Sequence, residues 1–490
     1  MILHVPKSVV KFGGRFLSCS ASVAPAHTRR ALASFIAGIV LTVSTRRSLT
    51  ALSGEVFSSR RHKSTVSRML RDRRFRTRDL LHLASKRAVN HLAPKDGEVV
   101  RWQLALDGTA VQHGAHTLIK GAIQSERKPK AERKSRKENA PKNRTESSSK
   151  KKGRKTKYHT FLLGVLTTHA GVRIPVGRYT CDPTNFNRGG RPRKIRATQM
   201  DHAKLMIERV LSILPKGVEL VVVADSYFEC EKLYNLAEQR EFTLITPTDS
   251  NRCFADEASP NRSNGLCIRD HGLQLSEDSF SRLDLHRGSE KTACYRRHSA
   301  RKAGPKDRRT YRLYHERRTV AKLGTVGIVY SWKTPVYEPR RNFGKKSFKI
   351  LLCSNPAWTA EDVVEWYECR WTAIEILIRE LKGQLGLDHY TGQSLEALER
   401  HIDLVLLSFL YLEVRRHEIL HDEATAPAIQ ARAKVSRTQG MQDLVRWEAG
   451  HQVLAAIRKS YRSERTRRRL KRFFSEVPSL LDVLPRRREA

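Results

Sequence analysis

The sequence has few acidic residues, no metal-binding cysteine spacing and no apolar run long enough to cross a membrane. Its eight Cys residues among 490 include no C-x-x-C pair. That argues against a zinc ribbon and provides no disulfide framework, so a reducing cytoplasm fits best. The most apolar stretch, residues 31–43, is shorter than the ~20 residues that span a bilayer. It also follows a long mixed polar segment, which is the wrong layout for a signal peptide.

The shortage of acid leaves a large positive charge. Lys and Arg together number 93 against 50 Asp and Glu, so the formal net charge is +43. An enzyme that acts on neutral substrates does not need this excess. A nucleic-acid partner explains it, because basic residues that neutralise phosphates release condensed counterions. A protein that lies on an anionic membrane surface is the alternative use of such charge.

Residues 1–92 are predicted to be a leader followed by a small helical DNA-binding domain. Residues 31–43 predict a buried helix, residues 48–52 a second short piece, and residues 64–70 a short basic helix that begins at a capping Ser. This order matches a helix-turn-helix, although a helical bundle that binds no DNA has the same pattern.

The next region, residues 93–249, alternates between strand and helix patterns. Residues 101–106 alternate in polarity, as a half-buried strand does, and residues 158–181 predict a hairpin that turns at 169–171. Residues 218–224 are almost all apolar, which is typical of a strand covered on both faces. The whole region reads strand, strand, strand, helix, strand, helix, strand, and this predicts an α/β fold with a mixed sheet flanked by helices.

One segment interrupts that region with a different composition. Residues 125–157 contain fifteen Lys or Arg and four Glu, with almost nothing apolar. We expect a disordered basic insertion, which either contacts DNA phosphates or serves as a solvated linker. Beyond the alternating region, residues 250–346 predict a β-rich insertion, residues 347–420 the last part of the core, and residues 421–490 a basic helical C-terminal region.

Three carboxylates occupy positions where a charge is unexpected. Asp107 and Asp225 follow apolar strands, and neighbouring strand ends of one sheet bring such groups together. Glu375 lies among apolar residues of a predicted helix over 367–382, where an uncompensated carboxylate costs free energy. If this helix packs on the sheet, the three acids converge. Hard oxygen ligands suit Mg²⁺ or Mn²⁺, and two such ions about 4 Å apart activate a water or a 3′-hydroxyl at a phosphodiester.

Three segments resemble the motif blocks of bacterial insertion-sequence DDE transposases, which have an RNase H-like catalytic core. They read LALDGT, VVVADSYF and YECRWTAIEILIRELK, and the resemblance covers roughly residues 95–415. It implies Asp107, Asp225 and Glu375 as catalytic metal ligands, with two Mg²⁺ or Mn²⁺ ions. The third block resembles the family's Tyr-Arg-Glu-Lys signature, and this implies that three residues contact DNA phosphates, namely Tyr367, Arg370 and Lys382.

The third block departs from the family pattern by one residue. Four residues, rather than three, separate Arg370 from Glu375, so on a regular helix the two side chains would point about 140° apart. Either the helix carries a bulge, as functional sites often do, or Arg370 acts differently and Arg379 is the spare cation. Glu380 is a competing acid that faces away. Trp332, in the β-rich insertion, is a candidate for stacking on an unpaired base, with core packing as the alternative.

The sequence therefore predicts a DNA transposase that binds terminal inverted repeats and target DNA, cleaves phosphodiesters and joins the freed 3′-hydroxyl to target DNA. Double-stranded DNA is the partner, at least a dimer is expected in the active complex, and the expected location is the nucleoid within the cytoplasm. One rival is an RNase H-like nuclease that joins no strands. Another is a DNA-binding protein with an inactive core.

Overall fold

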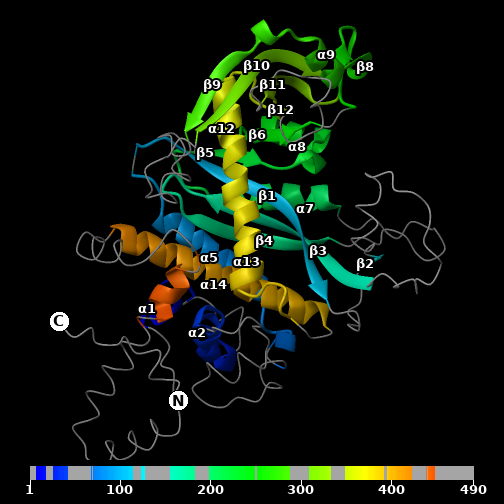
Figure 1. The fold of residues 1–490 in the computed structure, drawn as a ribbon. Helices are drawn as coiled ribbons and strands as arrows, with labels where there is room; N and C mark the ends of the chain where they lie inside the picture. The colour runs from blue at the N-terminus through cyan, green and yellow to red at the C-terminus, as the bar shows by residue number, and fades with distance from the viewer. Residues whose placement is uncertain are drawn as a thin grey trace, which may run out of the picture.

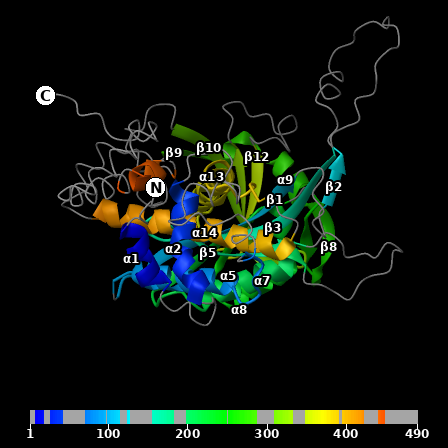
Figure 2. The same ribbon diagram turned by 90° about the horizontal axis from the view of Figure 1, so that it is seen from below.

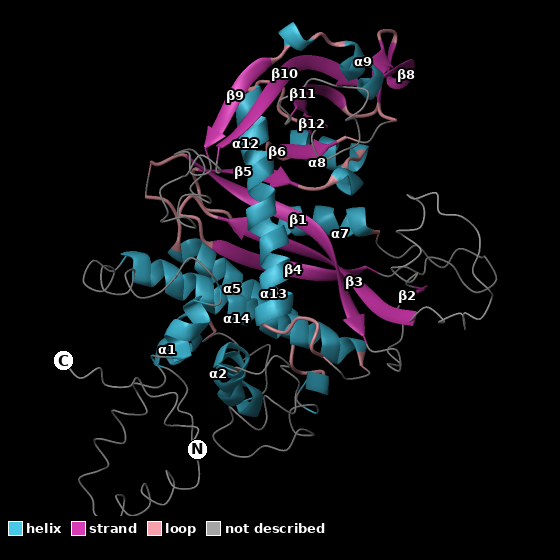
Figure 3. Cartoon of the chain, viewed as in Figure 1, coloured by secondary structure: helices cyan, strands magenta, loops and turns pink. Residues whose placement is uncertain are grey.

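A computed structural model of the chain places one wide mixed sheet at the centre of the molecule, with helices on both faces (Figures 1 and 3). The structure describes residues 7–17, 26–41, 68, 70–95, 97–113, 123–126, 155–181, 198–248, 251–286, 308–332, 348–390, 394–421, 438, 440–446 and 448. Within these residues, the predicted α/β class with a mixed sheet is confirmed.

The first part of the sheet is antiparallel. Its strands are β1 (Val100–His113), β2 (Ile123–Glu126), β3 (Lys155–Thr167) and β4 (Arg173–Cys181). β3 lies between β1 and β4, and the β3–β4 turn contains Gly171 at φ +72°, a conformation that favours glycine. The predicted hairpin is therefore confirmed. The basic insertion is shorter than predicted at both ends because β2 and β3 include its outermost residues, and residues 127–154 lie outside the described part.

The second part of the sheet is parallel and contains the buried strand. Its strands are β5 (Val218–Val223) and β6 (Thr243–Pro247). Two helices belong to the same region of the chain, α7 (Gln199–Leu211) before β5 and α8 (Glu231–Gln239) between the two strands. β5 pairs in parallel with β1 on one side and with β6 on the other. Val222 belongs to one hydrophobic cluster of the core and Val223 to the other, so β5 is covered on both faces as predicted.

β1 is longer than the sequence indicated. The prediction ended this strand at residue 106, with Asp107 after it, and this was wrong. Pairing with β5 stops at Ala105, opposite Val223, but pairing with β3 continues to His113. Asp107 therefore lies within β1, at the level where its parallel neighbour ends.

The β-rich region joins the same sheet instead of forming a separate one. Its elements, with the strand that follows it, are β7 (Cys253–Asp256), β8 (Ser259–Cys267), α9 (Ile268–Gln274), β9 (Ser281–His286), β10 (Arg308–Val320), β11 (Gly324–Trp332) and β12 (Phe348–Cys353). In the described residues the strand order is β2-β3-β1-β5-β6-β12-β11-β10-β7-β8, with β4 beside β3 and β9 beside β10. The predicted mostly β character of this region is confirmed, and the predicted strand over 348–353 links it to β6.

One long helical segment crosses a face of the sheet. It consists of α12 (Ala360–Arg370), a π-helical turn (Trp371–Glu375) and α13 (Ile376–Gln384). α12 packs over β5, β6 and the β10–β12 strands, and the π turn packs over β1 and β3. Figure 2 shows α13 and α7 on opposite sides of β1 and β3. The segment thus carries its side chains to the place where β1 and β5 part.

The N-terminal helices pack against the far end of the core. They are α1 (Lys7–Phe16), α2 (Ala26–Leu41) and α5 (Thr77–His91), and they contact α14 (Leu395–His421), the long helix whose start at Ser394 was predicted. The predicted helix over 31–43 corresponds to α2. Residues 48–52, most of 64–70 and the chain beyond 448 lie outside the described part. No helix in the described residues is long and apolar enough to cross a membrane.

Candidate active site

The site is organised by the π-helical turn between α12 and α13. The segment begins at Thr359, whose side chain accepts a hydrogen bond from the Asp362 backbone N–H, and it contains neither Gly nor Pro before Gly383. The turn over Trp371–Glu375 accommodates one residue more than an α-helical turn does. Of the two alternatives that the spacing between Arg370 and Glu375 left open, the structure shows the bulge.

The bulge brings Arg370 onto the same side as Glu375. The Nη1 atom of Arg370 donates a hydrogen bond to Oε1 of Glu375 at 2.6 Å. Its Nη2 atom lies 3.4 Å from Oδ2 of Asp107. One guanidinium therefore joins a carboxylate of the helix to a carboxylate of strand β1.

Asp225 is placed beside Asp107 by strand register. Ala105 of β1 pairs in parallel with Val223 of β5, so Asp107 and Asp225 each come two residues after a paired position. Asp225 caps the short 3₁₀ turn at Ser226–Phe228, where its Oδ1 accepts a hydrogen bond from the Tyr227 backbone N–H at 3.1 Å. Two of the three predicted acids therefore lie at one level of the sheet.

The charges of Asp225 and Glu375 both act on the carboxyl group of Asp107. Burial raises the pKa of Asp107 from 3.8 to about 6. The positive charge of Arg370 opposes this rise, and the negative charges of Asp225 and Glu375 add to it. The ion pair with Arg370 alone would favour the ionised acid, but the loss of hydration outweighs it. Burial also raises the pKa of Tyr367 to about 12, and the charges of the same two carboxylates contribute.

The donor chemistry suits a hard divalent cation, but the three acids are not grouped closely enough to share one. Three carboxylates supply oxygen ligands of the kind that Mg²⁺ and Mn²⁺ prefer. Among the described residues, however, no three His, Cys, Asp or Glu side chains are grouped closely enough to hold a metal ion. Arg370 lies between Asp107 and Glu375 and compensates their charges.

The other predicted cations lie further along α13. Lys382 donates a hydrogen bond from Nζ to the Ala110 carbonyl of β1 at 2.5 Å, and it lies 3.8 Å from Oδ2 of Asp388. Arg379 stacks over the ring of Trp371 at 5.7 Å. Glu380, the competing acid of the same helix, pairs with Arg173 of β4 at 3.2 Å.

Two predicted aromatic contacts have different settings. Tyr367 is buried against the sheet, with Lys349 Nζ lying 4.8 Å from its ring centroid. Trp332 is fully buried and packs edge-on against Phe348, with ring centroids 5.2 Å apart. The proposal that Trp332 stacks on an unpaired base is therefore wrong for this structure, and the alternative, core packing, is confirmed. β11 is buried from Val326 to its last residue, Trp332, which belongs to the larger hydrophobic cluster of the core.

Sequence reasoning missed two charged neighbours of the site. Lys349 is the lone charge of an otherwise apolar strand, and that isolation was the available signal. Asp388 follows the signature helix in the segment LGLDHY, and its pairing with Lys382 gave no sequence signal because it depends on how the chain turns after α13.

Neither a scan against known protein families nor a search of curated proteins finds a match to this chain. The resemblance of its three motifs to a transposase family therefore rests on the residues themselves.

The raised pKa of Asp107 gives a first testable prediction. Between the unfolded pKa of 3.8 and the folded pKa of about 6, the folded protein binds more protons than the unfolded chain, so stability falls as pH rises through this window. Asp107→Asn removes the effect. In metal-free buffer we expect the variant to gain stability over wild type as pH rises from 4 to 6, by about 2–3 kcal/mol in total. Urea unfolding across this range measures it, and a pH-independent difference would contradict the account.

Proposed function

We propose that the protein is a DNA transposase that binds element ends, cleaves phosphodiesters and transfers the cleaved strand to target DNA. The observation that carries this proposal is the meeting of three motif blocks at one place. Asp107, Asp225 and Glu375 come from segments far apart in the sequence. Arg370 contacts both Asp107 and Glu375, and strand register brings Asp225 to the level of Asp107. Ordinary packing does not require three carboxylates at one such place.

The strand arrangement supports an RNase H-like core. β1, β3 and β4 form an antiparallel group, and β5 and β6 extend it in parallel from the other side of β1, in the order β4-β3-β1-β5-β6. In such a core, acids at the end of the parallel pair face a helix that carries a third acid. The β-rich region widens the sheet beyond β6 without covering the site's strands.

In this proposal the three acids hold one or two Mg²⁺ or Mn²⁺ ions. A bound ion would activate a water or a 3′-hydroxyl and stabilise charge on the leaving oxygen. Lys382 positions the DNA end through its phosphates, and Arg379 adds a cation on the exposed side of α13. Tyr367 is buried in this structure, and its predicted phosphate contact would require its hydroxyl to become accessible in the DNA complex. Pairing two element ends needs at least two copies of the chain in the active complex.

The charge of the chain supports double-stranded DNA as the partner. The net charge is +43, and residues 125–157 alone contribute +11, from fifteen Lys or Arg and four Glu. We expect deletion of residues 127–154 to lower affinity for any DNA sequence and to flatten the salt dependence of binding, because fewer counterions are released. Fluorescence anisotropy with a labelled duplex at several salt concentrations measures both. If the slope of log affinity against log salt concentration is unchanged by the deletion, the segment is a linker that contacts no phosphates.

The proposal is tested with purified protein and a linear DNA that carries the genomic sequence on both sides of the coding region. With Mg²⁺ or Mn²⁺, we expect cleavage near the element ends and covalent joining of the released ends to a plasmid. Cleavage without joining favours the rival nuclease. DNA binding with neither reaction favours the inactive DNA-binding protein.

A further inference from the structure

We propose that Arg370 acts as an internal counter-ion that excludes divalent cations from the site of the free protein and releases the acids when a DNA phosphate engages it. This rests on the proposed function, because it concerns how the same site is regulated. The π turn brings Arg370 into contact with Asp107 and Glu375. A residue that only bound a DNA phosphate would not need these two contacts.

The geometry places the guanidinium where it competes directly with a metal ion. Its two terminal nitrogens contact Oδ2 of Asp107 and Oε1 of Glu375 at 3.4 and 2.6 Å. A divalent cation shared by these acids would use oxygen atoms of the same two carboxylates. Metal and guanidinium are therefore alternative partners of these two carboxylates.

Burial makes this competition strong. The side chains of Arg370 and Asp107 are 10% and 15% exposed, and that of Glu375 is 31% exposed. Charges in such a setting are screened less than those on the open surface, so removing one cation changes the field at the acids considerably. Burial also makes it costly to leave the ionised acids without a positive partner. We therefore expect either the Arg370 guanidinium or a divalent metal ion to accompany them.

Arg370 is also incompletely satisfied where it lies. Its Nε atom is buried and has no hydrogen-bond partner in the described part of the chain. A phosphate offers a planar guanidinium two parallel hydrogen bonds, and Arg is suited to this geometry. DNA can therefore replace the carboxylates as the partner of Arg370, and the freed carboxylates can then accept a metal ion.

The alternative is that Arg370 pairs permanently with the acids as a structural element. A permanent pair would keep Mn²⁺ out of the wild-type site whether or not DNA is bound. An exchangeable guanidinium would instead let the wild-type protein bind Mn²⁺ more tightly when a short duplex is added in excess, after correction for Mn²⁺ bound by the duplex alone. Both ideas require that Arg370 competes with a metal ion, and this is tested first, without DNA.

The test is Mn²⁺ binding by the full-length protein without DNA, measured by electron paramagnetic resonance of free Mn²⁺. We expect Arg370→Gln to bind Mn²⁺ about tenfold more tightly than wild type, between the few-fold effect of a fully screened charge pair and the about thousandfold effect of a half-buried one. Arg101→Gln is the matched control. It removes one positive charge from β1, the strand that carries Asp107, where Arg101 forms an exposed ion pair with Glu219 of β5. It should leave the affinity near that of wild type.

A second variant assigns the gain to the site. Adding Asp107→Asn to Arg370→Gln should abolish the gain, while circular dichroism and thermal unfolding establish that both proteins are folded. Equal Mn²⁺ affinity in wild type and Arg370→Gln overturns the proposal. An equal gain in Arg101→Gln also overturns it, because general electrostatics would then suffice.

The readout is separate from the test of function. A protein that cleaves no DNA can still show the tenfold gain, which would leave this inference standing and remove the transposase. A metal-dependent transposase can show no gain, which would leave the function standing and remove the role of Arg370 as a counter-ion.

Discussion

Replacing Glu375 by Gln is expected to lower the rate of metal-dependent DNA cleavage about a thousandfold or more while DNA affinity stays within a few-fold of wild type. The substitution keeps the size of the side chain but removes one negative oxygen from the three acids that surround the site. Metal catalysis supplies several kcal/mol of charge stabilisation, and each 1.4 kcal/mol corresponds to about tenfold in rate. Single-turnover cleavage of a labelled duplex and anisotropy binding measure the two quantities.

The matched control for this prediction is Glu361→Gln. Glu361 lies in the first turn of the same helix, α12, and no contact with the site is present among the described residues. It loses the same charge and should retain cleavage. If Glu375→Gln cleaves as fast as this control, Glu375 does not belong to the site. The competing acid, Glu380, could then take its place only by giving up its ion pair with Arg173.

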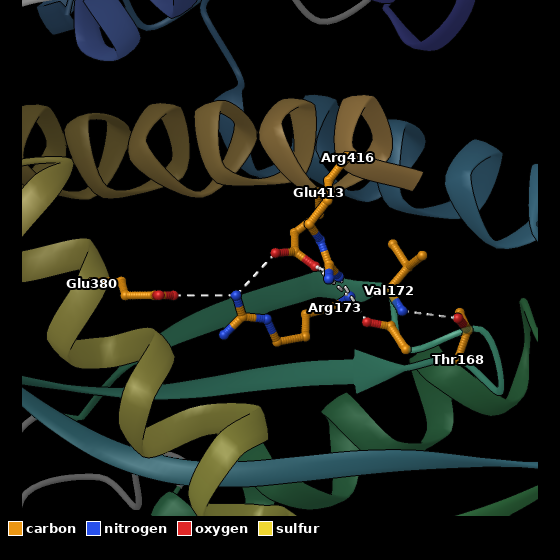
Figure 4. A network of polar contacts seen from close by, with 7 residues as sticks. Thr168, Val172, Arg173, Glu380, Glu413 and Arg416 are labelled. Atoms are coloured by element: carbon orange, nitrogen blue, oxygen red, sulfur yellow. Dashed lines mark hydrogen bonds and ion pairs between the residues drawn. The ribbon is translucent and has the colours of Figure 1, made fainter. Parts of the chain in front are cut away.

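Replacing Arg173 by Met is expected to cost about 3–5 kcal/mol of folding free energy, the range for breaking a buried ion pair. Figure 4 shows Arg173 of β4 between Glu380 of α13 and Glu413 of α14. Its Nη2 atom lies 2.9 Å from Oε1 of Glu413 and 3.2 Å from Oε2 of Glu380, and its side chain is almost fully buried. Loss of the guanidinium leaves Glu380 without its buried cation and Glu413 with Arg416 alone. Urea denaturation gives the free energy.

An exposed pair provides the control for that measurement. Arg101 and Glu219 join β1 and β5 at 2.8 Å, with side chains 42% and 55% exposed. Arg101→Met should change stability by no more than about 1 kcal/mol, because water screens the pair. A cost for Arg173→Met as small as that of the control would mean that this network does not hold α13 against α14.

The local patterns of the sequence were sufficient for many of the elements. Alternation and apolar runs predicted the hairpin of β3 and β4, the doubly covered β5 and the helix that carries Glu375. The expectation that Asp107 and Asp225 lie near each other agrees with the parallel pairing of β1 and β5, which brings both to one level, although β1 itself continues past Asp107. These features depend on the spacing of apolar residues within a short segment of the sequence, which repeats differently in strands and helices.

Features that depend on distant pairing were not predicted. β1 runs through Asp107 to His113 because β3, about fifty residues later, continues to pair with it. The β-rich region joins the main sheet through pairing of β11 with β12, which no local pattern specifies. Trp332 was ambiguous for the same reason, since its burial follows from the neighbouring Phe348.

The spacing between Arg370 and Glu375 was informative because it did not fit a regular helix. It left two alternatives, a bulge or a different role for Arg370, and the π turn at Trp371–Glu375 is the bulge. The partner of Arg370 was beyond sequence reasoning, because the guanidinium reaches Asp107 only when the helix packs on β1. The predicted domain boundaries stay predictions, as do the roles of residues 48–52 and 421–490.

The measurement that tests the account most directly is strand joining. A labelled duplex with a free 3′-hydroxyl, carrying the sequence from one side of the coding region, is incubated with a circular plasmid, Mg²⁺ and the full-length protein. The account predicts that the label becomes covalently attached to the plasmid with wild type and not with Glu375→Gln. Label that is hydrolysed but never joined, or joined equally by both proteins, would contradict a transposase whose chemistry depends on this acidic site.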